Sequence, residues 1–308
     1  MAAPRVGITF YNITTFLKGS GKEVLEFARE IDAKGIDVIS VVDHVAIANA
    51  TYEKAAAGEG DYPLGKEVTP GPPDEPIFEA MCLLSAIGAV TKNATLSMYI
   101  LVGPLRSSVL LAKQAATIDV LSGGRLELAL GAGWQAEEFR ASNVPFVGRF
   151  GILEEQIDIC RKLWREAPVS YAGRHTSFDG IWSFPQPLRK EIFTWLGLKA
   201  TERNSARIAR LADGWIPDYS TVEILEEGMD RIRHECRKIG RDPTGFPVRS
   251  SPSNAFDAEG NYDLDAALAT APGLLAAGAT EFTLNVTSGI NDEAALWKAV
   301  EYLTDLKR

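Results

Sequence analysis

The sequence predicts a single (β/α)8 barrel, an α/β fold in which eight parallel strands alternate with eight helices. Three observations support this prediction: short apolar runs alternate with longer amphipathic runs, most strand candidates are apolar without strict alternation, and no linker divides the 308 residues. Strands that are covered by helices on both faces read as continuous apolar runs, and barrels of this length are often single units. We therefore expect one domain over residues 1–308. A doubly wound sheet with an extra domain is the alternative, because periodicity alone does not separate the two.

Strands are expected where β-branched and apolar residues cluster. They cover Arg5–Phe10, Asp37–Val42, Thr95–Leu101, Arg125–Gly131, Ile192–Leu196, Gly214–Pro217, Val248–Ala255 and Glu281–Val286. Helices are expected where apolar residues recur every three or four positions. They cover Gly21–Lys34, Ile77–Val90, Ser107–Leu121, Gly151–Arg165, Thr201–Ala212, Val222–Ile239, Leu264–Ala277 and Asp292–Leu306.

Two long insertions break this rhythm. Ala46–Glu75 follows the second strand, and Pro168–Lys190 precedes the fifth. Loops of this length inside a domain are usually functional or partly disordered, and a tolerated surface insertion is the alternative. The first insertion would lie at the C-terminal barrel face, where enzymes of this fold carry their active sites. Aromatic residues near the loops suggest an apolar substrate pocket, or ordinary core: Phe10, Tyr11, Phe16, Phe178, Trp182 and Phe184.

Composition excludes several classes of protein. Acidic residues outnumber basic ones 41 to 32, which gives a formal charge of −9 and disfavours binding to nucleic acid or to anionic membranes. Three scattered cysteines without a CxxC pair, and three scattered histidines without an HxH pair, indicate neither a disulfide framework nor a metal site. No run of 18 apolar residues occurs, so we expect a soluble protein of the cytoplasm.

The strongest local motif is LSGGRLELALGAGW at 121–134, followed by QAEEF. A helix ends at the first glycine pair, a strand runs to Leu130, and the turn Gly131–Ala132–Gly133 opens the loop at the carboxyl end of the strand. Glycines at such a position let the backbone approach a flat ligand, because no Cβ blocks it.

This motif resembles the luciferase-like monooxygenase family, whose members are flavin- and deazaflavin-dependent (β/α)8 barrels. Further matches in the same order are Asp43–His44 after the second strand, Arg106 at the third helix, Arg149 in RFGILEEQIDICRKLW, and RIARLADGW at Arg207–Trp215. The likeness runs from Arg5 to about Leu284, and it rests on the order and spacing of these pieces together.

The resemblance implies a cofactor at the C-terminal barrel face, either the deazaflavin coenzyme F-420 or FMN. Asp43–His44 and the run SMYILVGPLR most resemble members that use F-420. If the roles found in those members hold in this chain, Asp43 would hydrogen-bond the ring or order its neighbour. His44 would donate or accept a proton near the reacting carbon. An imidazole suits this task because its unperturbed pKa lies near neutrality. The structural alternative is that Asp43 caps the loop and that His44 serves only as a hydrogen-bond partner of Asp43.

The third strand would pass beneath the ring. The resemblance implies ring contacts from Ser97, Tyr99 and Ile100, and a bulge with a non-prolyl cis peptide bond near Tyr99–Ile100. The alternatives are ordinary barrel interior for these side chains and a regular all-trans strand.

The segment Gly197–Arg203 corresponds to the place where the family binds the cofactor phosphate through backbone N–H groups at a helix start. Gly197 and Ala200 fit this role, whereas Lys199 and Thr201 replace the usual small residues and would bind phosphate through charge and hydroxyl. This departure leaves the cofactor identity open. The alternative is an ordinary helix with Thr201 as its N-cap.

Trp134 stands where the sugar-phosphate-oxidising members carry a glutamate, which argues against that reaction. The indole would stack on the ring or pack beside the fourth strand. Glu137 or Glu138 is expected to pair with Arg140 or Arg149 rather than act in the chemistry.

Two function classes remain. The first is an oxidoreductase that uses F-420 for hydride transfer to or from a small, apolar organic substrate, or alternatively an FMN-dependent monooxygenase supplied with reduced flavin by a partner reductase. The second is a non-catalytic flavin-family binding protein. The resemblance also implies a homodimer, with the apolar segment Ile77–Val90 as a candidate interface.

Overall fold

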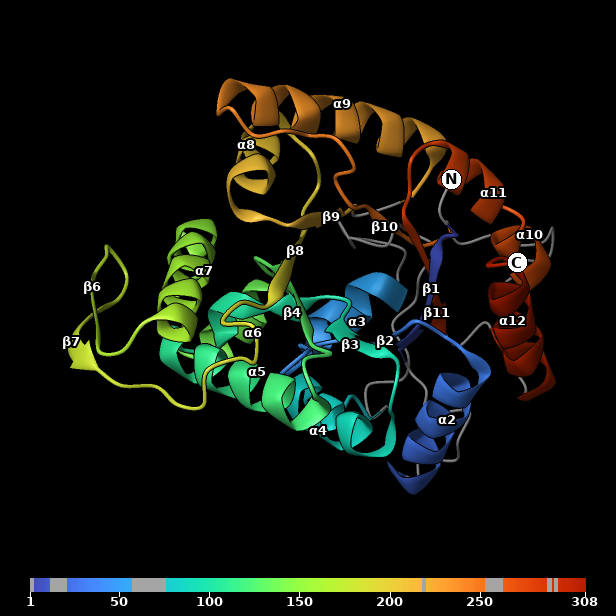
Figure 1. Ribbon diagram of the computed structural model, residues 1–308, viewed down its shortest axis with the longest axis horizontal. Helices are drawn as coiled ribbons and strands as arrows, with labels where there is room; N and C mark the ends of the chain where they lie inside the picture. Colours follow the sequence, from blue (N-terminus) through green and yellow to red (C-terminus); the bar gives the residue numbers. More distant parts are fainter. Residues whose placement is uncertain are drawn as a thin grey trace.

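The computed structural model describes residues 3–11, 21–56, 76–217, 220–252, 263–286, 290 and 293–308. Within them a closed barrel of parallel strands is surrounded by helices, which confirms the predicted fold (Figure 1). The strands are β1 (Arg5–Phe10), β2 (Val38–Val41), β3 (Thr95–Met98), β4 (Leu101–Val102), β5 (Glu127–Gly131), β8 (Phe193–Gly197), β9 (Gly214–Ile216), β10 (Arg249–Ser250) and β11 (Glu281–Val286).

The barrel closes from two sheets, one with the order β10-β11-β1-β2-β3 and one with the order β4-β5-β8-β9. Isolated parallel bridges join Leu96 to Leu126 and Trp215 to Val248, so the two sheets meet at both seams. β3 and β4 are two parts of the single strand expected over Thr95–Leu101, and strand order therefore follows chain order around the barrel.

The helices lie outside the barrel at the expected places. They are α2 (Gly21–Lys34), α4 (Ala80–Val90), α5 (Ser108–Ser122), α7 (Arg149–Arg165), α8 (Glu202–Leu211), α9 (Val222–Lys238), α10 (Leu264–Leu268), α11 (Ala271–Ala276) and α12 (Glu293–Asp305). The single helix expected over Leu264–Ala277 is wrong, because the chain ends one helix at Leu268 and starts another with Pro272 in its first turn. Proline lacks the N–H that a continuous helix needs, and it fits the first turn.

Both insertions lie where they were expected, and each adds structure that was not predicted. The first begins with α3 (Asn49–Ala56), and its residues 57–75 lie outside the described part. The second forms an antiparallel hairpin of β6 (Val169–Ala172) and β7 (Ser177–Ile181), which stands beside α7 and outside the barrel (Figure 1). A further short helix, α6 (Ala136–Ala141), follows the GAGW motif.

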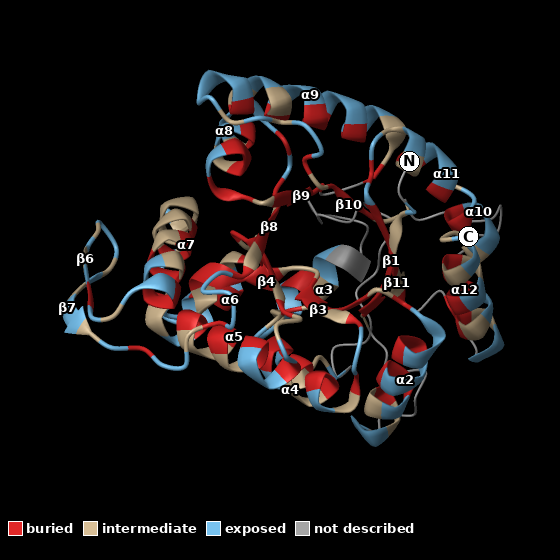
Figure 2. Cartoon of the chain, in the orientation of Figure 1, coloured by how far each residue is buried: buried red, intermediate tan, exposed pale blue. Residues whose placement is uncertain are grey.

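Burial follows the layers of the barrel, with the strands and the inner helix faces covered (Figure 2). α2, for example, buries Val24, Phe27, Ala28 and Ile31, which recur at helical spacing. The helices α5 and α9 begin with hydroxyl caps, from Ser107 and Thr221 respectively. Each such cap stabilises its helix by about 1 kcal/mol.

Buried ion pairs fill the lumen at the amino-terminal ends of the strands. Arg249 is fully buried, forms ion pairs with Glu281 and with Glu127 (3.1 Å), and lies over the Trp195 ring at 4.7 Å. Arg5 reaches the same two carboxylates at 2.9 and 3.2 Å. We call these four residues, Arg5, Glu127, Arg249 and Glu281, the lower network. Burial raises the pKa of Glu281 even though both arginines act against the shift.

Candidate active site

His44 emerges just after β2, at the carboxyl end of the barrel. Its side chain is 16% exposed, and its Nδ1 lies 3.3 Å from Oε2 of Glu138. The Trp134 ring meets the imidazole edge-on, with the centroids 5.9 Å apart. The structure therefore brings together the predicted histidine, the predicted tryptophan and a carboxylate that was not predicted to lie there.

The loop that carries His44 is held by α6 and the residue before it. Glu138 Oε1 accepts hydrogen bonds from the backbone N–H of Val45 (2.6 Å) and of Ala46 (3.3 Å). Gln135 accepts from the N–H of Ala48 at 2.9 Å and donates to the carbonyl of Ala46 at 2.8 Å. Both side chains are buried and lie three residues apart, on one face of the helix start.

The expected pairing of Glu138 with Arg140 or Arg149 is therefore wrong. Arg149 instead donates to the carbonyl of Gly133 at 2.9 Å and lies over the Phe146 ring at 3.8 Å. Burial lowers the pKa of Arg149. α6 has only six residues, so hydrophobic periodicity could not predict it. The available signal was the spacing of two polar residues, Gln135 and Glu138, three positions apart next to Phe139.

Asp43 is fully committed to protein partners. Its two carboxylate oxygens accept from Arg106 at 2.7 Å each, and one also accepts from the N–H of Val102 at 2.9 Å. Burial alone would lower the pKa of Arg106, but Asp43 and Glu79 outweigh it and raise that pKa. The Asp43 side chain is 1% exposed, and its contact with a cofactor ring stays a prediction.

The third strand is broken where the sequence predicted a bulge. β3 ends at Met98, β4 starts at Leu101, and the Tyr99–Ile100 peptide bond is cis, as expected. The Tyr99 hydroxyl donates to Oγ of Ser251 at 3.0 Å. Ser97 lies fully buried below the break and accepts from Arg249 at 2.9 Å, so its hydroxyl faces a protein partner.

The glycines at the ends of β5 and β8 make room for Ile100. A Cβ on Gly131 would lie 3.2 Å from Cγ2 of Ile100, and a Cβ on Gly197 would overlap the Ile100 side chain. Gly133 has a φ of +77°, and a Cβ there would lie 2.6 Å from Val102. The glycines thus allow a close approach, but the group that approaches them is protein.

Thr201 is the N-cap of α8, because its hydroxyl accepts from the N–H of Asn204 at 3.3 Å; this confirms the capping alternative. Lys199, Ala200 and Thr201 line a cavity of about 200 Å³ between α8 and α9. Lys199 is exposed and makes no ion pair with any residue of the described part. An unpaired ammonium beside a helix start fits an anionic group such as phosphate.

The upper lumen is lined by small polar side chains. Lumen-facing residues alternate along the strands, and the row in register at this end contains Thr9, Ser40 and Asn285. Thr9 and Ser40 hydrogen-bond each other at 3.3 Å, whereas Oδ1 of Asn285 is buried without a partner among the described residues. Small side chains and an orphaned polar atom are compatible with a site that a ligand completes.

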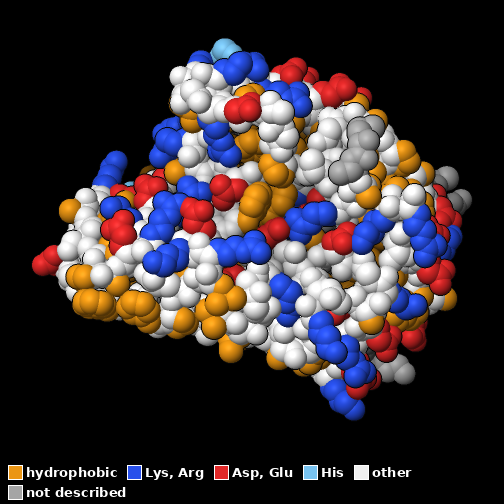
Figure 3. All heavy atoms as spheres, viewed as in Figure 1, with side chains coloured by type: hydrophobic (Ala, Val, Ile, Leu, Met, Phe, Trp, Pro, Cys, Tyr) orange, Lys and Arg blue, Asp and Glu red, His pale blue; other side chains and the backbone are white. Residues whose placement is uncertain are grey.

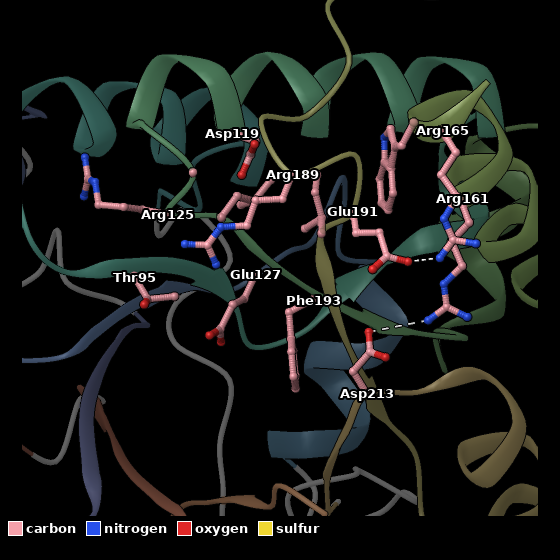
Figure 4. Close-up of a pocket in the computed structure, with 14 residues that line it drawn as sticks. Thr95, Asp119, Arg125, Glu127, Arg161, Arg165, Arg189, Glu191, Phe193 and Asp213 are labelled. Atoms are coloured by element: carbon pink, nitrogen blue, oxygen red, sulfur yellow. Dashed lines mark hydrogen bonds and ion pairs between the residues drawn. The ribbon is translucent and has the colours of Figure 1, made fainter. Parts of the chain in front are cut away.

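A cavity of about 700 Å³ lies at the opposite end of the barrel, below the lower network. Figure 4 shows two pairs of its charged side chains turned toward one another: Arg161 pairs with Asp213 at 3.5 Å, and Arg165 pairs with Glu191. Burial raises the pKa of Asp119 in its wall. Because its charges balance and it is remote from His44, we place the active site at the carboxyl end, despite the larger volume here.

The aromatic residues of the second insertion do not line the site. Trp182 and Phe184 are 67% and 55% exposed and stack on each other outside the barrel. Figure 3 shows apolar side chains along this edge of a face that otherwise mixes acidic and basic groups. Phe10 points outward and packs on Phe27 of α2, and Phe16 lies outside the described residues. The predicted aromatic pocket is therefore wrong for Phe10, Trp182 and Phe184.

The described residues include no helix with the length and the apolar character that a membrane span requires. They also contain no group of three His, Cys, Asp or Glu side chains that could hold a metal ion.

The features described above define a parallel α/β barrel with a histidine loop at its carboxyl end and a broken third strand. The family model described as luciferase-like monooxygenase matches residues 9–259, and the chain belongs to this family of oxidoreductases. An uncharacterized protein of Mycobacterium tuberculosis is 29% identical over 240 residues, which cover 77% of this chain and 81% of the relative.

Two further similarities concern proteins with a named activity. An FMNH(2)-dependent dimethylsulfone monooxygenase of Pseudomonas putida is 32% identical over 168 residues, 53% of this chain and 45% of that one. The coenzyme F420-dependent tetrahydromethanopterin reductase of Methanopyrus kandleri superposes with a TM-score of 0.73 at 14% identity, covering 99% of this chain and 98% of that one. The latter likeness shows the fold alone.

Proposed function

We propose that this chain is an F-420-dependent oxidoreductase that transfers a hydride to or from a small, apolar organic substrate. The observation that carries the proposal is His44, an imidazole held by Glu138 at the carboxyl end of the barrel. Hydride transfer between a ring and a carbon–oxygen centre requires a proton to reach or leave the oxygen, and an imidazole carries protons near neutral pH.

The site residues divide into three tasks. His44 holds or releases the proton, while Tyr99, Ile100, Gly131, Gly133 and Trp134 form the surface against which the ring would lie. Gly197, Lys199, Ala200 and Thr201 would hold its phosphate, with Lys199 supplying charge. Asp43 and Ser97 order this surface from below through Arg106 and Arg249. The deazaflavin supplies the hydride chemistry when it is bound, and the protein supplies position and exclusion of water.

An FMN-dependent monooxygenase is the second candidate. It is favoured by the identity with the dimethylsulfone monooxygenase and by the departure of Lys199 and Thr201 from the usual phosphate segment. This candidate implies a partner reductase that supplies reduced flavin. A non-catalytic binding protein is the remaining alternative, and the retained His44 with its buried partner argues against it.

We further propose a cytoplasmic homodimer, in which the apolar α4 within Ile77–Val90 contributes to the interface. α4 has no charged residue, and Cys82 and Ala89 are exposed on its outer side. Gel filtration at working concentration should give the mass of two chains. Elution at the mass of one chain would contradict the proposed dimer.

The decisive experiment is a titration of the purified protein with F-420 and, separately, with FMN, following the fluorescence of each ring. Saturable tight binding of F-420 alone is the expected result. Tight binding of FMN alone would replace the proposal with oxygen chemistry. Binding of neither would favour the non-catalytic alternative and point to the altered Gly197–Arg203 segment.

A further inference from the structure

Glu138 is a buried carboxylate whose three hydrogen-bond donors among the described residues all belong to the loop that carries His44. Oε1 accepts from the N–H groups of Val45 and Ala46, and Oε2 faces Nδ1 of His44 at 3.3 Å. Its side chain is 1% exposed, and no Lys or Arg of the described residues pairs with it. A buried carboxylate without a cation depends on its hydrogen-bond donors, so Glu138 and the loop require one another.

The geometry points to a specific consequence for the imidazole. An ionised carboxylate only accepts hydrogen bonds, so Nδ1 of His44 must carry a hydrogen to bond with it. In neutral imidazole the other nitrogen is then an acceptor. We propose that Glu138 is a positioning residue that holds His44 in the Nδ1–H tautomer and leaves Nε2 free to exchange a proton with a bound molecule. The inference rests on the proposed role of His44.

The surrounding contacts make this arrangement rigid. Gln135 ties down the next turn of the loop through Ala48 and Ala46, and the hydroxyl of Thr51 donates to its amide oxygen at 2.7 Å. Phe139, which follows Glu138, is fully buried and packs edge-on against Phe146 at 5.3 Å. α6 is thereby fixed in the core and cannot turn Glu138 away without exposing that ring.

The substitution Glu138→Gln tests the proposal. The amide oxygen of glutamine can still accept from Val45 and Ala46, but its NH₂ group would face Nδ1 as a donor. Nδ1 must then be the acceptor, so the tautomer inverts. We expect nitrogen-15 NMR of the histidine-labelled, ligand-free protein to show the Nδ1–H form in the wild type and the Nε2–H form in the variant. The His44 signal is identified by its loss in His44→Ala.

The adjacent Glu137 offers a matched control, because it is exposed on the same helix. Glu137→Gln should leave the tautomer unchanged, and Glu138→Asp should retain the Nδ1–H form. In the loaded enzyme Glu138→Gln should lower kcat by about 100-fold or more, the scale of general acid–base catalysis, with the Kd for F-420 changed less than about twofold.

An Nε2–H tautomer in the wild type would overturn the proposal, and so would a Glu138→Gln variant with unchanged tautomer and turnover. If Glu138→Gln fails to fold, the wild-type tautomer and Glu138→Asp still decide. The tautomer is measured without cofactor. A failed F-420 titration would therefore contradict the proposed function without affecting the test of the tautomer.

Discussion

The two ends of one barrel lumen have opposite characters. At the amino-terminal end every charge of the lower network has a partner, and Arg249 alone contacts two carboxylates and the hydroxyl of Ser97. At the carboxyl end the lumen row is small and polar, Oδ1 of Asn285 has no partner within the described part of the chain, and His44 is partly exposed. Closed polar networks contribute to a unique fold, whereas open polar groups are available to a ligand. The difference supports the proposal that the closed end contributes stability and the open end carries the chemistry, as in other barrels.

The first prediction removes the imidazole of His44 from the open end of the lumen. His44→Ala should lower turnover by about 10²- to 10⁴-fold, the usual contribution of a general acid or base. Cofactor affinity should change little, because the assigned role of His44 is proton transfer. The free energy of unfolding should fall by about 1–3 kcal/mol, because the imidazole is the only donor to Oε2 of Glu138 among the described residues. Steady-state kinetics, a fluorescence titration and urea unfolding on the same preparation give the three quantities.

His234→Ala is the matched control, since His234 is exposed on α9, and it should match the wild type. If His44→Ala weakens cofactor binding as much as it slows turnover, then His44 is a binding group and its assigned role in proton transfer is wrong.

The sequence predicts the fold and the break in the third strand, but not the lower network of the closed end. All eight βα units were predicted, because apolar runs and helix periodicity are local patterns. The break at Tyr99–Ile100 followed from a family resemblance. The lower network did not, because it joins Arg5, Glu127, Arg249 and Glu281 from four strands that are distant in the chain.

The same reason explains the errors at the site. Glu138 was assigned to nearby arginines because sequence proximity was the only guide, and it instead contacts a loop some ninety positions earlier. The sequence also did not show that Ile100 occupies the space beside Gly131 and Gly197, and the approach of these glycines to a ligand stays a prediction. Composition could identify polar and aromatic residues, but not the direction in which each side chain points, as Trp182 shows.

The second prediction breaks the closed end. Arg249→Met removes the fully buried cation of the lower network and leaves the half-exposed Arg5 as the remaining cationic partner of Glu281 and Glu127. It should lower the free energy of unfolding by about 2–3 kcal/mol, less than the about 3–5 kcal/mol that a fully unpaired buried charge costs. Burial already raises the pKa of Glu281, and loss of Arg249 raises it further. A carboxyl group with a raised folded pKa destabilises the fold as pH rises, so the loss should be larger at pH 8 than at pH 5.

Urea unfolding at the two pH values measures this loss. Arg233→Met is the control, because Arg233 forms a surface pair with Asp230 at 3.4 Å and its side chain is 43% exposed; it should cost less than about 0.5 kcal/mol. A loss under about 1 kcal/mol for Arg249→Met at both pH values would show that the lower network does not hold the closed end together.

The smallest expected effect tests the rim of the open end. Lys199→Ala should raise the Kd for the phosphate-bearing cofactor by about 3- to 10-fold at low salt, because an exposed ammonium contributes a screened attraction of about 1 kcal/mol. The effect should shrink as salt is added, and Lys199→Arg should retain most of the affinity. Lys162→Ala makes the same charge change at an exposed position of α7, and it should leave the Kd unchanged. If Lys199→Ala has the wild-type Kd at low salt, then the phosphate lies elsewhere. The cavity between α8 and α9 would then be a packing defect beside a capped helix, and the open end would consist of the lumen row and the His44 loop alone.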